Sequence, residues 1–317
     1  MKEKRYIVAV LAVLVYVVAG GAEPKVHQEG RIRVVYYTEG RDAVLPDDKN
    51  GNGVPDHVED VLTQTVAARL LFVEVLGFPD PVETRRFRAA GCVDIRFKSK
   101  DSGIGNGLAF DELQSARRVP GDPEDARCIA FNVVATLDPK KNGTPSHEYF
   151  HLIQYSVSYF KNSWYAEGMA RWSERGLGAG ALGTAEPLAA WPLPPDRAAE
   201  IFAMSYNASA SFWNPLAARH GADSALPAGP ALDKLQVMKY TDGTPVLNDL
   251  AFTGWRFMRD VLLELGKADE TAFREQAYDR WSEANQFSPK NNAYILRAVE
   301  AVAARHGRTD QTDQLPR

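Results

Sequence analysis

The stretch TPSHEYFHLIQYSVS, residues 144–158, holds the residues that decide the fold. Thr144 suits the N-cap and Pro145 the first turn, so the pattern predicts a helix that runs to about Ser158. His147 and His151 are four residues apart, which places both imidazoles on one face of that helix. Two imidazoles so placed can reach one ion at about 2.0–2.1 Å. The stretch therefore predicts a helix that carries two metal ligands.

Glu148 completes a His-Glu-x-x-His pattern, which is typical of zinc peptidases. Its carboxylate would lie beside the metal and take a proton from water whose pKa zinc lowers to about 7. The extended metzincin pattern has glycine and histidine where this chain has Gln154 and Val157, so that class is excluded. The alternative to a zinc site is a buried helix whose two histidines are satisfied by hydrogen bonds.

A catalytic zinc site takes a third protein ligand and keeps one position open. Glu167 stands sixteen residues after His151, in a second predicted helix over 164–174. A loop followed by an antiparallel helix would bring its carboxylate to the ion, as in the glutamate-zincins. Glu174, two turns later on the same face, is the reserve ligand. The alternative for Glu167 is an ordinary surface position on a helix.

When water attacks a carbonyl group, the carbonyl oxygen becomes an oxyanion, and a second electrophile besides zinc would help to stabilise it. Tyr206, which precedes a predicted helix over 208–220, is the candidate. The alternative is an aromatic side chain that packs where the C-terminal helices begin.

A second stretch, residues 48–59, has the spacing of a calcium-binding loop. Gly53 supplies the sharp turn, whereas Pro55 departs from the EF-hand and matches the Asp-rich loops of thrombospondin type 3-like repeats. The alternative is an Asx-rich turn without metal, and the expected role is structural. The expected oxygen ligands, at loop positions 1, 3, 5, 7, 9 and 12, are Asp48, Asn50, Asn52, the Val54 carbonyl, Asp56 and Glu59.

The first 22 residues predict a signal peptide. Lys2, Lys4 and Arg5 precede an apolar run over 6–18, and Gly20-Gly21-Ala22 suits a signal peptidase. The run is shorter than the ~20 residues of a membrane-spanning helix. We therefore expect a secreted or periplasmic protein with no stable membrane span after cleavage; an uncleaved anchor is the alternative.

Export bears on the two cysteines, because cysteines outside the cytosol more often pair than stay free. Cys92 and Cys128 each introduce a β-rich run, so we expect a disulfide between neighbouring strands. The second run, 129–134, is a candidate for pairing with an extended peptide substrate.

Composition and element order predict an α+β protein. The chain has 45% hydrophobic residues, which indicates a globular fold, and a net charge of -4 without a basic patch, which argues against nucleic acid. Strands are expected first and helices later, and 102–125 is expected to be loop. A Gly-, Ala- and Pro-rich segment divides a catalytic half, 23–185, from a helical C-terminal subdomain, 186–317. Further predicted elements are a strand over 31–38 and helices over 58–76, 249–265, 271–284 and 292–306.

With these pieces in order, residues 31–221 resemble a bacterial family of secreted metalloproteases of the MXAN type, related to the MA clan. The resemblance rests on YYT at 36–38, NGVPD at 52–56, LGF at 76–78, HEYFHLIQY at 147–155 and WYAEGMA at 164–170, with a weaker match at Phe212-Trp213. It implies a zincin-like core, zinc ligands His147, His151 and Glu167, and Glu148 as the base.

The first expectation is thus an exported zinc-dependent endopeptidase that acts on proteins or peptides. A second hypothesis is a non-catalytic, calcium-dependent adhesion or envelope module on a degenerate zincin scaffold. Retention of Glu148 favours the enzyme, since a structural zinc site has no use for a base there. A zinc hydrolase of non-peptide substrates is a third possibility, and the sequence makes no prediction about oligomeric state.

Overall fold

A computed structural model describes residues 23–117, 121–177, 188, 190–221, 225–248 and 250–312. It contains a mixed sheet with helices packed against it, which confirms the predicted α+β class. The three inner strands are parallel, and the outer strands run antiparallel to their neighbours. In sheet order the strands are β1 (Lys25–Glu29), β2 (Ile32–Tyr36), β3 (Cys92–Lys98), β6 (Arg127–Val134) and β4 (Gly107–Ala109), with β5 (Gln114–Ser115) also on β6.

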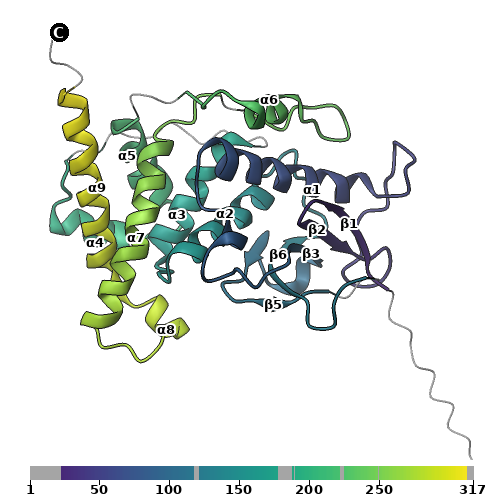
Figure 1. The fold of residues 1–317 in the computed structure, drawn as a ribbon, viewed down its shortest axis with the longest axis horizontal. Helices are drawn as coiled ribbons and strands as arrows, with labels where there is room; N and C mark the ends of the chain where they lie inside the picture. Colours follow the sequence, from purple (N-terminus) through teal and green to yellow (C-terminus); the bar gives the residue numbers. More distant parts are fainter. Residues whose placement is uncertain are drawn as a thin grey trace, which may run out of the picture.

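Helices cover one face of the sheet. α1 (Asp56–Arg69), extended by a π-helical segment to Val75, crosses the strands, and α2 (Thr144–Val157) packs beside it on β6 and β4. α3 (Ser163–Ser173) packs on α2 and is followed by a 3-10 turn, Glu174–Gly176. Figure 1 shows α2 and α3 in the middle of the molecule, between the sheet and the last helices.

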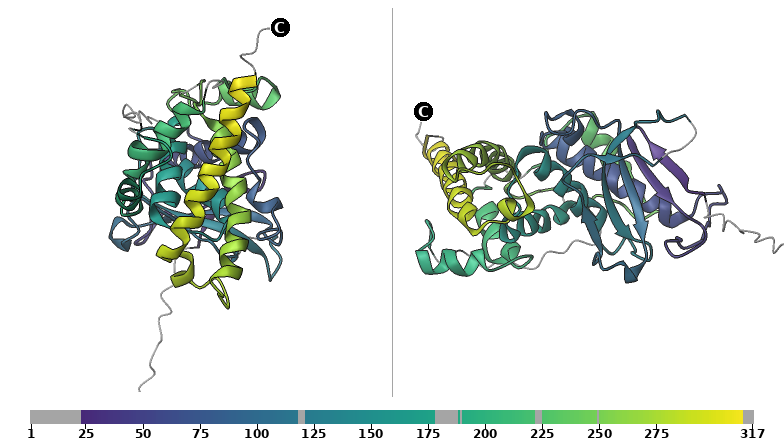
Figure 2. Two further views of the ribbon diagram at one scale, coloured as in Figure 1. Left: turned by 90° about the vertical axis from the view of Figure 1, so that its left-hand side faces the viewer. Right: turned by 90° about the horizontal axis from the view of Figure 1, so that it is seen from below.

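Most of the remaining helices lie on the side of α2 and α3 away from the sheet (Figure 1). The exception is α6 (Pro230–Val237), which packs against the π-helical segment after α1 and places Lys234 3.0 Å from Glu29 of β1. α7 (Trp255–Glu275) and α9 (Asn292–Thr312) lie side by side on the side away from the sheet, as both views in Figure 2 show. One cluster of buried apolar side chains joins these helices to the sheet, since it includes Val34 of β2, Phe150 of α2 and Val302 of α9. The other helices are α4 (Pro195–Phe202), α5 (Asn214–Arg219) and α8 (Glu283–Gln286).

The C-terminal helices begin and end at residues other than those expected from the sequence. α7 continues through the gap expected between 265 and 271, because its buried side chains recur along one face from Phe257 to Ala272. The helix expected over 271–284 is therefore wrong, and α4 and α6 were not predicted. The stretch 208–220 is a π-helical turn followed by α5, with Pro215 in the first turn, where proline is tolerated.

The segment 102–125 was expected to be loop but contains β4 and β5. Both strands pair with β6 in the sheet, and the residues that follow β5 reach its polar face, where Arg33 and Asp94 form a buried ion pair at 2.7 Å. The backbone N–H of Arg117 donates to the same Asp94 carboxylate at 3.1 Å. Short strands of this kind carry little periodicity, which is why the sequence did not predict them.

Cys92 and Cys128 are directly opposite each other in the parallel register of β3 and β6, but both thiols are free. The neighbouring strands were predicted correctly, whereas the disulfide is not formed in this structure. Each sulfur instead has a polar partner: Cys92 Sγ lies 3.5 Å from Asp94 Oδ1, and Cys128 Sγ accepts from Arg96 at 3.3 Å.

The predicted signal peptide, residues 1–22, lies outside the described residues. Among the helices described, none is both long enough and apolar enough to span a bilayer.

Candidate metal centre

Two histidines of α2 and a glutamate of α3 meet at one point. One ligand atom each from His147, His151 and Glu167 lies within 4.8 Å of the other two. The Nε2 atom of His147 is 3.3 Å from Glu167 Oε2, and that of His151 is 3.6 Å from Glu167 Oε1. Among the described residues this is the one such group of His, Cys, Asp and Glu. The antiparallel course of α3 therefore brings the expected third ligand to the expected pair.

Glu174 lies behind His147 rather than beside the convergence point. Its Oε1 atom is 2.9 Å from Nδ1 of His147, the ring nitrogen that faces away from Glu167. Its Oε2 atom accepts from the Arg171 guanidinium one turn earlier, and the side chain is buried. The expectation that Glu174 is a reserve ligand is therefore wrong, because His147 stands between it and the point where the ligand atoms meet. A carboxylate in this place orients the imidazole and makes it a stronger ligand.

His151 has an equivalent partner on its own helix. Nδ1 of His151 lies 2.8 Å from Oε1 of Gln154, which is 1% exposed. With Nδ1 occupied in both rings, each Nε2 atom is directed toward Glu167. Two imidazole nitrogens and a carboxylate oxygen are the donor set of catalytic zinc sites that keep an open fourth position, so these residues fit zinc.

The electrostatics of the centre favour a cation. Burial alone would lower the pKa of His147, but contacts with Glu167 and Glu174 raise it to about 10. Burial would raise the pKa of Glu167, but hydrogen bonds with the two histidines lower it strongly. Carboxylates and imidazoles thus stabilise positive charge between them, whether protons or a divalent ion supply it.

Glu148 lies beside the ligands and beneath strand β4. Burial raises the pKa of its carboxyl group, and the nearby backbone of Ala109 opposes part of that rise. The fit under β4 depends on Gly107, since a Cβ atom there would be 2.5 Å from Glu148 Oε1 and 2.7 Å from the Thr144 methyl. The sequence offered no local signal for this contact, because residues 107 and 148 belong to different elements.

The ligands face a cleft of about 310 Å³. Residues 104–109, which include β4, form one wall, and Tyr155 and Tyr206 contribute to its lining. Tyr155 was not predicted as a site residue. Its ring stacks on His151 with centroids 5.5 Å apart, and its i+4 position on the same helix was the available signal.

Strand β4, not β6, offers an open edge to this cleft. The expectation that 129–134 pairs with substrate is wrong, because β3 occupies one side of β6 and β4 occupies the other. In β4 the neighbours Asn106 and Phe110 hydrogen-bond to β6. The peptide groups of Gly107 and Ala109 therefore point the other way, by the alternation of an antiparallel ladder.

Tyr206 lines the cleft, but its hydroxyl is directed away from the ligand atoms. The ring stacks on His147 with centroids 5.3 Å apart and is 43% exposed. The hydroxyl lies 3.3 Å from Glu174 Oε1 and 3.5 Å from His147 Nδ1. In this conformation Tyr206 contacts the outer side of His147, so a role at the oxyanion needs a side-chain rotation.

The predicted calcium loop wraps around its own side chains. Asp48 accepts from the backbone N–H of Gly53 through Oδ2 at 2.8 Å. The side-chain amides of Asn50 and Asn52 donate to the two oxygens of Glu59, at 2.9 and 2.8 Å. Both oxygens of Glu59 thus face the loop, as a bidentate calcium ligand at position 12 does.

The predicted ligand Asp56 is oriented differently. Its Oδ1 atom accepts from the backbone N–H of Lys49 at 3.1 Å, and the residue is buried at the start of α1. Asp56 therefore joins the start of the loop to the start of α1, whereas the side chains of Asn50 and Asn52 converge on Glu59.

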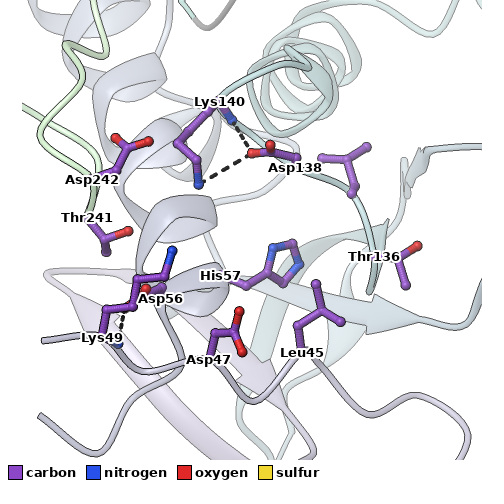
Figure 3. Close-up of a pocket in the computed structure, with 11 residues that line it drawn as sticks. Leu45, Asp47, Lys49, Asp56, His57, Thr136, Asp138, Lys140, Thr241 and Asp242 are labelled. Atoms are coloured by element: carbon purple, nitrogen blue, oxygen red, sulfur yellow. Dashed lines mark hydrogen bonds and ion pairs between the residues drawn. The ribbon is translucent and has the colours of Figure 1, made fainter. Parts of the chain in front are cut away.

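Behind the loop lies a polar cavity of about 220 Å³ (Figure 3). His57 extends among its lining side chains, and its Nε2 atom has no hydrogen-bond partner among the residues that the structure describes. Lys140 bridges two acids at the rim, with Nζ 2.7 Å from Asp60 and 3.4 Å from Asp138. The cavity and the metal centre are thus separate features.

Comparison of the chain with family models, curated proteins and solved structures finds no significant match.

Proposed function

We propose that the protein is an exported, zinc-dependent endopeptidase on a zincin-like core. The observation that carries the proposal is the convergence of His147, His151 and Glu167 beside a fourth side chain, Glu148, that is free to act as a base. Zinc held by these three residues would supply a Lewis acid that polarises a carbonyl and lowers the pKa of water. Glu148 would accept the proton of the attacking water and return it to the leaving amine.

The edge of β4 favours a peptide as the substrate. An extended peptide can add to an open strand edge by backbone hydrogen bonds, independently of most of its side chains. The peptide groups of Gly107 and Ala109 face the side of β4 away from β6, and both residues line the cleft beside Glu148. This juxtaposition would hold a scissile bond next to the base, and it supports peptide hydrolysis over hydrolysis of a small non-peptide ester.

We also propose that residues 48–59 bind calcium with a structural role. The two oxygens of Glu59 and the side chains of Asp48, Asn50 and Asn52 supply hard oxygen donors around one turn. The Asn amides would turn their oxygens toward the ion, which a rotation about one bond allows. Export through the signal peptide would place this loop where calcium is plentiful.

The test of the enzyme is Glu148→Gln in the mature protein. The amide keeps the shape and leaves the ligands in place but cannot take the proton, so hydrolysis of casein should fall about 10²–10⁴-fold. Zinc content, measured by elemental analysis, should stay near that of the wild type. The matched control is Glu112→Gln, an exposed glutamate in the segment that follows β4, which should cleave at the wild-type rate.

Each outcome separates the hypotheses. Zinc binding without cleavage of any peptide mixture by the wild type would favour the non-catalytic module. Equal rates for Glu148→Gln and wild type would show that Glu148 is not the base. Glu167→Gln should lose zinc and activity together, and unchanged zinc content in that variant would contradict the third-ligand assignment.

A further inference from the structure

Gln154 contacts both halves of the candidate metal centre. Its Oε1 atom lies 2.8 Å from Nδ1 of His151, and its Nε2 atom donates to the backbone carbonyl of Ala166 at 3.2 Å. Ala166 is the residue before Glu167, so the second bond is made to the helix that carries the third ligand. Gln154 and Ala166 are 1% and 3% exposed, which leaves water little access to either bond.

The orientation of the amide follows from the chemistry of its partners. A backbone carbonyl only accepts hydrogen bonds, so the side of Gln154 that faces Ala166 must be the NH₂ group. The side that faces His151 is then the oxygen, which also only accepts. Nδ1 of His151 must therefore carry the proton, and Nε2 keeps its lone pair for the point shared with Glu167. The carbonyl of Ala166 thus sets the tautomer of His151 through one amide.

We propose that Gln154 is a positioning residue that fixes the tautomer of His151 and the distance between α2 and the turn of α3 that bears Glu167. This inference rests on the proposed function, since it concerns the same centre. This role differs from that of Glu174. Either oxygen of the Glu174 carboxylate can accept a hydrogen bond from His147, whereas the Gln154 amide can accept from His151 only when its oxygen, and not its NH₂ group, faces the ring.

Gln154→Met tests the proposal, because methionine fills a similar volume and makes neither hydrogen bond. Zinc affinity, measured by competition with a chromophoric chelator, should fall about 10–100-fold. In the zinc-loaded wild type, NMR should show a slowly exchanging Nδ1–H on His151, and Gln154→Met should lose that protection. The control is Gln286→Met, which removes a buried glutamine that contacts Asp111 instead, and should leave zinc affinity unchanged.

Gln154→Glu separates the two bonds and keeps the test valid if the methionine variant does not fold. Its carboxylate can accept from His151 but cannot donate to Ala166, so zinc affinity should exceed that of Gln154→Met while thermal stability falls below wild type. Wild-type affinity in Gln154→Met would overturn the proposal and leave the proposed function intact. Equal losses in folded Gln154→Glu and Gln154→Met would overturn the tautomer argument. A wild type that binds no zinc would overturn the proposed function and this role with it.

Discussion

Gly107 and Glu148 are in such close contact that residue 107 cannot carry a side chain in this geometry. A Cβ atom at Gly107 would lie 2.5 Å from Oε1 and 2.7 Å from Cγ of Glu148. Strand β4 therefore covers the proposed base directly, and the same strand supplies the open edge of the cleft.

Gly107→Ala should displace Glu148 or lift β4 from the cleft. A misplacement of about 1 Å at a catalytic group can cost on the order of 10²-fold in rate, so casein hydrolysis should fall by that order while zinc content persists. The control is Gly91→Ala, where a Cβ atom would make an ordinary 3.7 Å contact. Full activity in Gly107→Ala would contradict the conclusion that the packing of β4 on Glu148 positions the proposed base.

Glu174→Gln should weaken zinc binding without removing a ligand. The amide can still accept from His147, but the negative charge behind the ring and the ion pair with Arg171 are lost. We expect an affinity loss of about 10-fold, and a larger one in Glu174→Ala. Glu200→Gln breaks an arginine–glutamate pair of the same spacing at an exposed position, so it should leave zinc affinity unchanged. Loss of stoichiometric zinc in Glu174→Gln would instead indicate direct ligation.

Calcium should stabilise the folded protein through residues 48–59. With a dissociation constant of about 10⁻⁴–10⁻³ M, typical of extracellular loops, about 10 mM calcium would add roughly 1.4–2.7 kcal/mol. Glu59→Gln should abolish the calcium-dependent rise in melting temperature, and Glu39→Gln, at an exposed position, should keep it. The increment is the decisive quantity, because the variant also changes the calcium-free baseline. Equal melting temperatures of the wild type with and without calcium would mean that the loop is only a turn.

Asp269 should make stability depend on pH. Burial raises its pKa to about 6, although the backbone N–H of Tyr159 donates to it, and Glu270 raises the value further while Arg86 lowers it. The folded state therefore holds the proton more tightly than the unfolded chain, whose Asp pKa is about 3.9. The resulting stabilisation is present below pH about 4 and is lost as pH rises through 6, by on the order of 3 kcal/mol.

Asp269→Asn removes this titration but keeps an acceptor for Tyr159. Chemical denaturation at intervals between pH 4 and 7 should show the variant gaining on the wild type as pH rises. His57, whose pKa burial lowers to about 4, changes stability in the opposite sense over part of this range, so the difference between the two proteins is the quantity to compare. A constant difference across that range would refute the assignment.

The sequence by itself determined those features that depend on short-range geometry. His147 and His151 share a face because four residues make about one helical turn, and this holds wherever the helix packs. The turn at Gly53 and its bond to Asp48 are likewise local. The antiparallel placement of Glu167 needed only a short connection between two helices. The order of strands and helices was enough for the α+β class.

The tertiary structure decided what depends on segments far apart in the chain. Glu174 shares a helical face with Glu167, yet the ring of His147 lies between Glu174 and the point where the ligand atoms meet. The helical periodicity of the sequence does not predict this placement. Residues 129–134 read as a strand, but only the register of the sheet shows that both its sides are taken. The link from Gln154 to Ala166 and the cover of β4 over Glu148 likewise arise from packing between elements. Such contacts are set by how whole elements fit together, for which no local pattern of residues carries a signal.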